Sequence, residues 1–333
     1  MTGGRKAGFF FWPYDPAYTA RMAALGERLG FDLIGVADTP GNAMDLWVAL
    51  GVAAARTERV PLACVTNFVS RHPLVTASAA ASLGATCDGR FILGVGTGHS
   101  AAVSAGARPT APAAFRDGLV FTRTLLAGER ASWNGAAAVL PKPAHRVPVY
   151  AAGSGPGALT AAGAVADGVF VNYGLQAEHV TAARAHVREG ARAAGRAADD
   201  LDEWWIACLD VSARRETALD KLGNIVGFVA AYVVGPDPAK RGVPADLVPA
   251  IHEMRRTYTT RRADMDPALL HRLGLFDYLR RRLAVAGTPE DCVEQVRAAR
   301  AAGARNLMFT VSLASDPERT VELFGREVLP HVR

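Results

Sequence analysis

The chain has 333 residues, of which 50% are hydrophobic and 21% are charged, so it is able to bury a large core and does not have the composition of a disordered chain. Its formal net charge of +5 is ordinary for this length and does not require a nucleic-acid partner. The four cysteines lie far apart, and their spacing indicates neither a zinc site nor a disulfide framework. No segment has the pattern of a secretory signal or a membrane span. We therefore expect a cytoplasmic protein without a metal, a nucleic acid or a membrane as partner.

Apolar runs alternate with helical patterns from the N-terminus onward. The helical patterns lie at about 15–30, 44–56, 73–87, 113–126, 157–166, 177–194 and 317–328. The apolar runs predict eight strands, at 6–12, 32–37, 60–69, 90–95, 147–152, 168–172, 204–211 and 306–311. Eight such units close naturally into a (β/α)₈ TIM barrel, whereas the alternative, an open doubly wound sheet, typically has about five to seven strands.

The connection between the seventh and the eighth predicted strand is much longer than the others. It contains several helix breakers, among them Gly235, Pro238, Pro244 and Pro249. We interpret residues 235–282 as a helical insertion, so that residues 1–333 form one barrel domain of the α/β class.

In a barrel of this kind, reactive groups come from the carboxyl ends of the strands and the loops that follow them. The loop over 153–157 is the most informative of these, because its glycines lie between a buried strand and a helix N-terminus, where a phosphate binds well. The candidate residues there are Gly153, Ser154, Gly155, Pro156 and Gly157; the alternative is a loop that merely turns tightly. A second, weaker candidate is the loop that contains Gly96 and Gly98. A phosphate-bearing cofactor across the mouth would explain why the strand ends offer few acid–base pairs.

Several segments in barrel order carry a family resemblance. Residues 65–73 (VTNFVSRHP) resemble the strand-three signature of the luciferase-like flavin and deazaflavin enzymes, especially of methylenetetrahydromethanopterin reductases. Residues 88–96 (DGRFILGVG) are similar to the strand-four motif of that family, and residues 286–290 (AGTPE) to its last crossover. Segments from 151 to 172 resemble its phosphate region.

The resemblance implies a flavin-type ring that rests on a bulge in strand three, where the chain carries Cys64, Val65, Thr66 and Asn67. In deazaflavin-using relatives that bulge is a non-proline cis peptide, which here corresponds to the bond between Cys64 and Val65. The sequence departs from the family pattern at Cys64, where relatives often have glycine, and at Phe68, where they often have proline.

Two residues are candidates for catalysis as well as for cofactor binding. Asp38 ends the second strand and could contact the ring or an acidic proton of the substrate, although a capping or solvated carboxylate is an equal alternative. His99 lies in the loop after strand four and could meet a phosphate or the substrate. Trp12, Tyr14 and Tyr173 could form an aromatic wall for the substrate, or could simply be packed.

The resemblance implies an oxidoreductase that passes a hydride between reduced coenzyme F-420, a 5-deazaflavin, and an unsaturated carbon or imine of a small organic substrate. An FMN-dependent luciferase-like monooxygenase is the first alternative, because it uses the same fold and similar loops. A non-catalytic flavin-binding protein is the second. A homodimer is possible, although no heptad or exposed stripe requires one.

Overall fold

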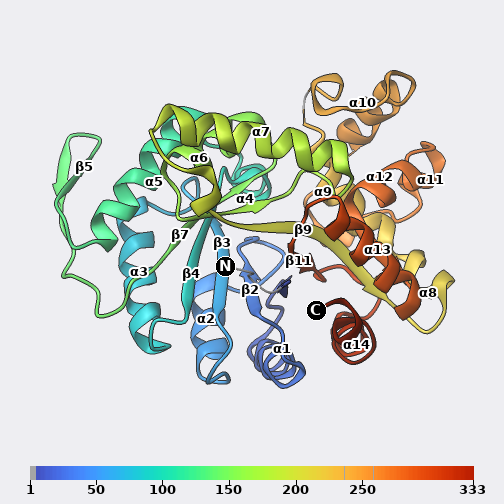
Figure 1. The fold of residues 1–333 in the computed structure, drawn as a ribbon, viewed down its shortest axis with the longest axis horizontal. Helices are drawn as coiled ribbons and strands as arrows, with labels where there is room; N and C mark the ends of the chain where they lie inside the picture. Colours follow the sequence, from blue (N-terminus) through green and yellow to red (C-terminus); the bar gives the residue numbers. More distant parts are fainter. Residues whose placement is uncertain (1–4, 236, 258) are drawn as a thin grey trace.

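The computed structural model describes residues 5–235, 237–257 and 259–333. Eight parallel strands close into a ring in the order β11-β1-β2-β3-β4-β7-β8-β9, and β9 pairs with both β8 and β11 (Figure 1). They span Ala7–Phe11 (β1), Leu33–Ala37 (β2), Leu62–Asn67 (β3), Phe91–Gly96 (β4), Val149–Gly153 (β7), Gly168–Val171 (β8), Asp202–Val211 (β9) and Asn306–Thr310 (β11). The eight strands predicted from the sequence, and the barrel, are confirmed.

Helices surround the barrel and mostly follow the predicted pattern. They span Pro16–Leu29 (α1), Leu46–Ala54 (α2), Pro73–Thr86 (α3), Pro112–Leu126 (α5), Pro156–Val165 (α6), Ala177–Ala193 (α7), Pro289–Ala301 (α13), Pro317–Leu323 (α14) and Leu329–Val332 (α15). Local chemistry sets their ends: Asp15 accepts a hydrogen bond from the Tyr18 N–H at the start of α1, and Gly30 ends that helix at φ +78°.

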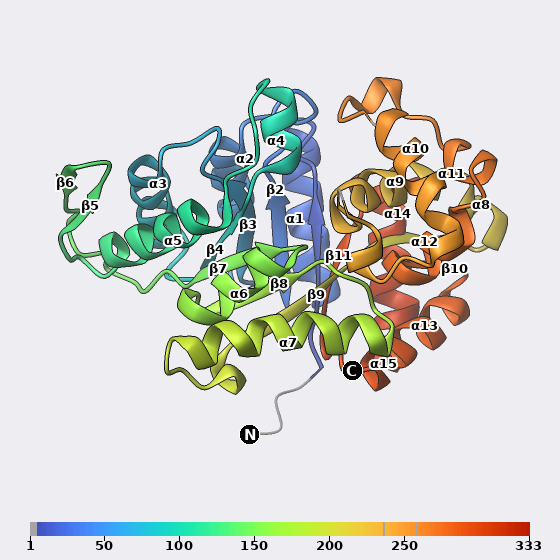
Figure 2. The ribbon, with the colours of Figure 1, turned by 90° about the horizontal axis from the view of Figure 1, so that it is seen from above.

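The long connection between β9 and β11 is folded into helices beside the barrel. It contains α8 (Arg215–Asp220), α9 (Leu222–Val233), α10 (Val248–Thr257), α11 (Leu269–Arg272) and α12 (Phe276–Leu283), followed by the short strand β10 (Ala284–Gly287) and α13. Figure 2 shows α8–α12 together on one side of the barrel, while the hairpin of β5 (Ala131–Trp133) and β6 (Ala136–Ala138) projects on the opposite side. The helical part begins earlier than residue 235, at Arg215.

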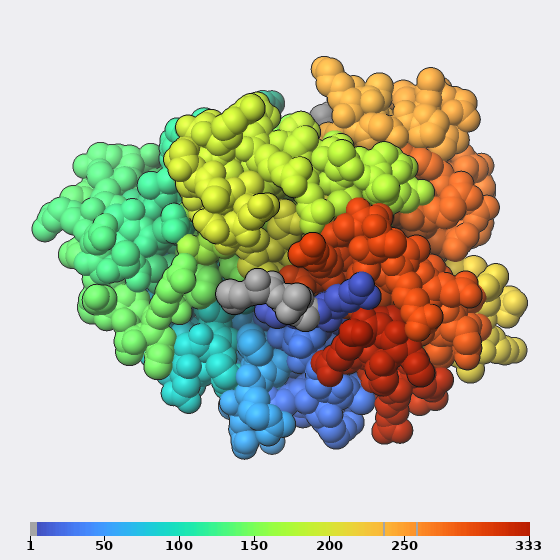
Figure 3. All heavy atoms as spheres, in the orientation of Figure 1, coloured from blue at the N-terminus to red at the C-terminus, as the bar shows by residue number. Residues whose placement is uncertain are grey.

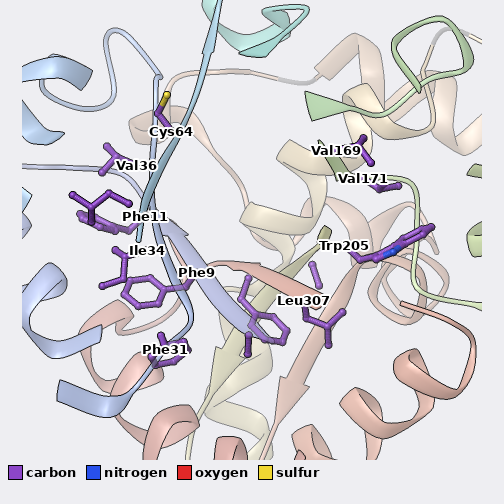
Figure 4. Close-up of a cluster of buried hydrophobic side chains, with 14 of the residues drawn as sticks. Phe9, Phe11, Phe31, Ile34, Val36, Cys64, Val169, Val171, Trp205 and Leu307 are labelled. Carbon is purple, nitrogen blue, oxygen red and sulfur yellow. The ribbon is translucent and has the colours of Figure 1, made fainter. Parts of the chain in front are cut away.

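Side chains alternate along each strand between the barrel interior and the helical layer. Phe10 belongs to the cluster inside the barrel, whereas Phe9 and Phe11 on the same strand belong to the core that the helices cover. Cys64 lies with Val36 and Phe11 in that outer core (Figure 4). Burying a large apolar side chain stabilises the folded state by about 1.5–3 kcal/mol, so these two layers hold the strands in place.

Strand β9 has more neighbours than an ordinary barrel strand. Its first residues pair with β8, from Asp202 to Trp205, and its last residues pair with β10, from Cys208 to Val211. Cys208 also pairs with Thr310 of β11 on its other edge. Strand β10 therefore occupies, near the mouth, the edge of β9 that β8 occupies lower down.

The first and last parts of the described chain lie side by side (Figure 3). Strand β1 pairs with β11, and the Arg333 guanidinium donates to the Gly30 carbonyl at the end of α1. Closure of the barrel thus brings the first and last described segments to one side. Among the described residues, no helix is both long enough and apolar enough to cross a bilayer.

The expectation of a cis peptide bond between Cys64 and Val65 is wrong, because that bond is trans. The reason is visible in the pairing of β3, which runs without interruption from Leu62 to Asn67 against β4 and from Leu62 to Val65 against β2. Regular parallel pairing on both edges requires an extended trans backbone at this point.

Candidate functional site

One pocket lies at the carboxyl ends of the barrel strands. It has a volume of about 980 Å³, which includes space open to solvent and is at the upper end of the range for small-molecule sites. The lining combines strand ends and loops with one face of α9: Phe10, Trp12, Ala37, Asp38, Thr39, Val65, Thr66, Asn67, Gly96, Thr97, Gly98, His99, Ser100, Ala101, Ala152, Gly153, Ser154, Phe170, Asn172, Ile206, Ile225, Phe228, Val229, Tyr232 and Thr310. In a barrel, the residues that follow the strands lie at the same mouth, so Asp38, Asn67, Gly98 and Ser154 are expected to lie there together. This location is confirmed, because all four line this pocket.

Asp38 is a buried carboxylate that accepts hydrogen bonds from Thr66 of β3 and from Arg71, which follows β3. Its Oδ2 atom accepts from the Thr66 hydroxyl at 2.7 Å and from Arg71 Nε at 3.1 Å, and only 3% of its side chain is exposed. Arg71 also donates to Asp45 at 2.8 Å. Asp38 is therefore fixed and charge-compensated, which suits orientation of a ligand better than proton transfer.

The Asn67 side chain shapes the loop after β3. Its Oδ1 atom accepts from the backbone N–H groups of Val69 and Ser70, at 3.0 and 2.8 Å, and from the Ser70 hydroxyl at 3.1 Å. After β4, Gly98 leads into α4 (His99–Ser104). Its φ of +88° would be strained for any residue with a side chain. At Gly96, a Cβ atom would meet nothing closer than 3.7 Å, so the pocket is open beside this strand end.

The glycine loop after β7 meets an arginine that the sequence did not single out. The Arg241 guanidinium donates to the Ser154 carbonyl, and a Cβ atom at Gly155 would come within 2.5 Å of that guanidinium. The same guanidinium lies 5.9 Å from the centre of the Tyr173 ring. A positive charge, a helix N-terminus and a side-chain hydroxyl thus converge at this edge of the pocket, as binding of a phosphate requires.

His99 is half-buried at the first turn of α4, on the pocket side. Its ring centre lies 5.6 Å from that of Tyr232 on α9. Burial, assisted by the positive charge of Arg255, lowers the pKa of His99 below its ordinary value. The imidazole is therefore neutral near pH 7, which makes it a proton acceptor.

Six residues expected in the site do not line the pocket. They are Tyr14, Cys64, Gly155, Pro156, Gly157 and Tyr173. The Cys64 thiol faces the helical layer, because strand alternation turns it away from the interior, and burial raises its pKa strongly. Tyr14 donates its hydroxyl to the Ser312 carbonyl, and Tyr173 is packed against Arg241 and Arg282.

The residues of α9 that line the pocket were not predicted from the sequence. Ile225, Phe228, Val229 and Tyr232 line the pocket at intervals of three, four and seven residues from the first, which is one face of a helix. That spacing is visible in the sequence and could have predicted the face. Nothing in the sequence, however, shows that the face turns toward the barrel mouth. Among the described residues, no cluster of three His, Cys, Asp or Glu side chains could hold a metal ion.

Comparisons with known proteins place the chain among enzymes of this architecture. The sequence model of the luciferase-like monooxygenase family matches residues 3–306. The F-420-dependent glucose-6-phosphate dehydrogenase of Nakamurella multipartita is 31% identical over 341 residues, covering 96% of this chain and 94% of that protein. The 5,10-methylenetetrahydromethanopterin reductase of Methanolobus tindarius is 29% identical over 338 residues, covering 97% and 99%.

Solved structures with the same fold are also found. The coenzyme F-420-dependent tetrahydromethanopterin reductase of Methanopyrus kandleri superposes with a TM-score of 0.80 at 24% identity, covering 99% of this chain and 100% of that one. This likeness shows that the two chains share the barrel.

Proposed function

Because the chain belongs to the luciferase-like monooxygenase family, and is thereby an oxidoreductase, we propose that it transfers a hydride between coenzyme F-420 and an unsaturated carbon or imine of a small organic substrate. The F-420-dependent glucose-6-phosphate dehydrogenase of Nakamurella multipartita covers 96% of this chain. The observation that carries the proposal is the joint position of Asp38, Thr66, Gly96 and Ser154 around one pocket at the barrel mouth.

The residues present fit a flat cofactor with a phosphate. The backbone of Val65 and the open side of Gly96 leave room for a ring beside β3 and β4, and the Thr66 hydroxyl and Asp38 supply polar groups at its edge. Arg241 and the loop from Gly153 to Gly157 would hold the phosphate. When bound, the deazaflavin would supply the hydride chemistry, and the protein would bind and orient it.

His99 is the residue that we propose as the proton carrier. Hydride transfer to a carbonyl or imine carbon needs one proton at the neighbouring oxygen or nitrogen, and the reverse reaction releases that proton. His99 lines the pocket, and its lowered pKa leaves a neutral imidazole that accepts the released proton near neutral pH. Asp38 is paired with Arg71, so we assign it to positioning the cofactor.

Cofactor binding tests this function directly. We would titrate the purified protein with coenzyme F-420 and, separately, with FMN, and follow tryptophan fluorescence, since Trp12 lines the pocket. We expect saturable binding of F-420 with higher affinity than FMN. Tighter binding of FMN, with oxygen consumption after reduction, would replace the proposal by the family's other chemistry, an FMN-dependent monooxygenase. Binding without turnover of any substrate would leave the chain a flavin-binding protein.

We also propose that residues 235–282 are an insertion into a single barrel domain and that the protein works in the cytoplasm. The insertion shares a core with the barrel, since Trp12 and Cys208 pack in one cluster with residues of α9–α12. The four cysteines are reduced and buried, which suits a reducing compartment.

A further inference from the structure

A buried amide at the end of β8 lines the pocket and has an unused acceptor. Asn172 follows β8 directly, is 5% exposed, and donates from Nδ2 to the Tyr232 hydroxyl at 3.1 Å. Its Oδ1 atom is buried and has no hydrogen-bond partner among the residues that the structure describes. Buried carbonyl groups in folded proteins are almost always satisfied, and because Asn172 lines the pocket, its Oδ1 atom is a candidate acceptor for a ligand that donates a hydrogen bond.

The orientation of the amide does not change this conclusion. If its nitrogen and oxygen exchanged places, the oxygen would face Tyr232 and the NH₂ group would face the unused position. In either arrangement one polar atom of Asn172 is left for a ligand. The amide oriented as in the structure requires a ligand O–H or N–H, and this is the arrangement that we use.

The lining of the pocket offers no direct cationic partner to an anionic substrate, although the positive charge of Arg255 acts on His99. The lining within the described residues contains no lysine or arginine. Its only acidic side chain, Asp38, is paired with Arg71, and His99 is neutral near pH 7 because its pKa is lowered. Arg241 borders the pocket but contacts the Ser154 carbonyl at the loop assigned to the cofactor phosphate. A substrate phosphate would lose its hydration without gaining a cation of its own, which is strongly unfavourable.

The α9 side of the pocket is suited to an apolar body. Ile225, Phe228 and Val229 line it, and the Trp12 and Phe228 rings meet edge to face with centres 5.4 Å apart. These side chains offer contact area and no charge. Tyr232 lies on the same helix face and connects this apolar wall to the Asn172 amide.

Resting on the proposed function, we infer that the substrate is uncharged, places an aromatic or aliphatic ring against α9, and donates a hydroxyl or N–H hydrogen to Asn172 Oδ1. Phosphorylated substrates are excluded. Asn172 is thus a specificity-determining residue, and Tyr232 is the positioning residue that holds its amide.

Three matched probes test this inference by isothermal titration calorimetry on the protein loaded with coenzyme F-420. They are 4-hydroxyacetophenone, acetophenone and 4-acetylphenyl phosphate, which differ in the donor and in the charge. We expect 4-hydroxyacetophenone to bind about threefold to tenfold more tightly than acetophenone, as one neutral hydrogen bond predicts, and the phosphate ester to bind more than about tenfold more weakly than either. Equal binding of the first two, or tight binding of the phosphate ester, would overturn the inference.

Two variants separate the amide from the rest of the pocket. In Asn172→Leu, the preference for 4-hydroxyacetophenone over acetophenone should disappear. The control is Thr39→Val, since Thr39 lines the pocket after β2, four strands away from β8 in either direction around the barrel. That variant should keep the full preference. A preference that survives in Asn172→Leu would contradict the role of Asn172.

Tyr232→Phe provides a second measurement should Asn172→Leu fail to fold. It withdraws only the hydroxyl that holds the amide, and we expect the preference to shrink to about half or less of its parental ratio. A full parental preference in Tyr232→Phe would show that the amide is not positioned by this contact and would count against the inference.

The same titrations distinguish this inference from the proposed function. Binding of F-420 together with a preference for the phosphate ester would refute the uncharged substrate while leaving the cofactor intact. Absence of F-420 binding, with the probe preferences retained in the cofactor-free protein, would refute the cofactor and leave the substrate class standing.

Discussion

The two walls of the pocket are built differently. On the β2–β3 side, polar side chains are locked by their own partners: Asp38 by Thr66 and Arg71, and Asn67 by the loop that follows it. On the α9 side, Ile225, Phe228 and their neighbours are apolar and make packing contacts. The barrel wall is therefore preorganised for one defined ligand, while the helix wall offers a surface whose shape decides what else enters.

The difference indicates a division of labour. A shared cofactor needs fixed donors and acceptors, and the strands of a rigid barrel supply them. In the function that we propose, the wall assigned to the substrate comes from the segment between β9 and β10. Variants of both walls test this division.

The largest effect is expected at the position where the walls meet. His99→Ala should lower kcat by about 100-fold to 10,000-fold, because it removes the proton acceptor while the cofactor contacts of the barrel wall remain. In the parent, the rate in the proton-releasing direction should fall with decreasing pH only below the ordinary His pKa, because burial lowers that pKa. The measurement is a pH profile of kcat alongside the F-420 dissociation constant. A variant that loses F-420 binding and kcat together would place His99 in the cofactor wall instead.

Two buried carboxylates, Asp38 in the barrel wall of the pocket and Asp210 outside the pocket, differ in whether a cation lies beside them. Asp38 has a cation beside it, whereas Asp210 at the end of β9 accepts from the Ser315 N–H and the Thr320 hydroxyl, which are uncharged. Burial raises the pKa of Asp210 to about 6. Because the folded state then binds the proton more tightly than the unfolded state, the contribution of Asp210 to the free energy of unfolding should decrease as pH rises from about 4 to 6, by about 3 kcal/mol.

Asp210→Asn should remove this pH dependence. The measurement is urea unfolding at pH 4, 5, 6 and 7 for the parent, Asp210→Asn and the exposed control Asp199→Asn. We expect the Asp210→Asn protein to gain stability relative to the parent as pH rises, while Asp199→Asn follows the parent. Parallel profiles for all three proteins would contradict the unpaired state of Asp210.

On the barrel wall, Asp38→Asn should cost about 1–3 kcal/mol of stability and weaken cofactor binding. The variant keeps an acceptor for Thr66 but leaves Arg71 without its buried partner, and that guanidinium is only 20% exposed. Asp45→Asn is the matched control, since Asp45 pairs with the same Arg71 but is 48% exposed. It should cost less than about 1 kcal/mol in thermal or urea unfolding. Equal costs for the two variants would show that Asp38 is no better fixed than a surface carboxylate.

The smallest effect concerns Arg241, which reaches the barrel wall from the segment after α9. Arg241→Gln should weaken F-420 binding by about tenfold through loss of a charge-assisted contact, and should leave the affinity for an uncharged substrate unchanged. Its neighbour Lys240, which pairs with Asp237 at the surface, gives the control Lys240→Gln. Unchanged F-420 affinity in Arg241→Gln would move the phosphate to the loop around Gly98.

The sequence was sufficient for the barrel because its strands are buried apolar runs that alternate with helical patterns. It was insufficient where an element is short or depends on a distant partner. Strand β10 has four residues and is a strand only because the end of β9 offers it an edge. The hairpin of β5 and β6 had a local signal that went unused: Asn134 and Gly135 both have positive φ, as a tight hairpin turn requires.

The site, too, could be predicted only in part. The location of Asp38, Thr66, Asn67 and Ser154 at one mouth could be predicted, because the parallel strands of a barrel all end on one side. Tyr173 could not be placed, since one step along the chain from Asn172 turns a side chain from the pocket to the packing around Arg282. The role of α9 depended on how a long connection folds back, which no local pattern encodes.

The sharing of β9 between β8 and β10 leaves these two strands apart at the mouth of the barrel. Near its start β9 pairs with β8, whereas near its end it pairs with β10, and β8 and β10 do not pair with each other among the described residues. The Leu175 N–H donates to the Arg282 carbonyl where β8 and β10 part. Below the pocket, Leu33, Tyr150, Trp204 and Met308 fill the barrel interior with side chains. The interior is thus closed by side chains below the pocket, and this sets how deep a flat ring can descend from the mouth.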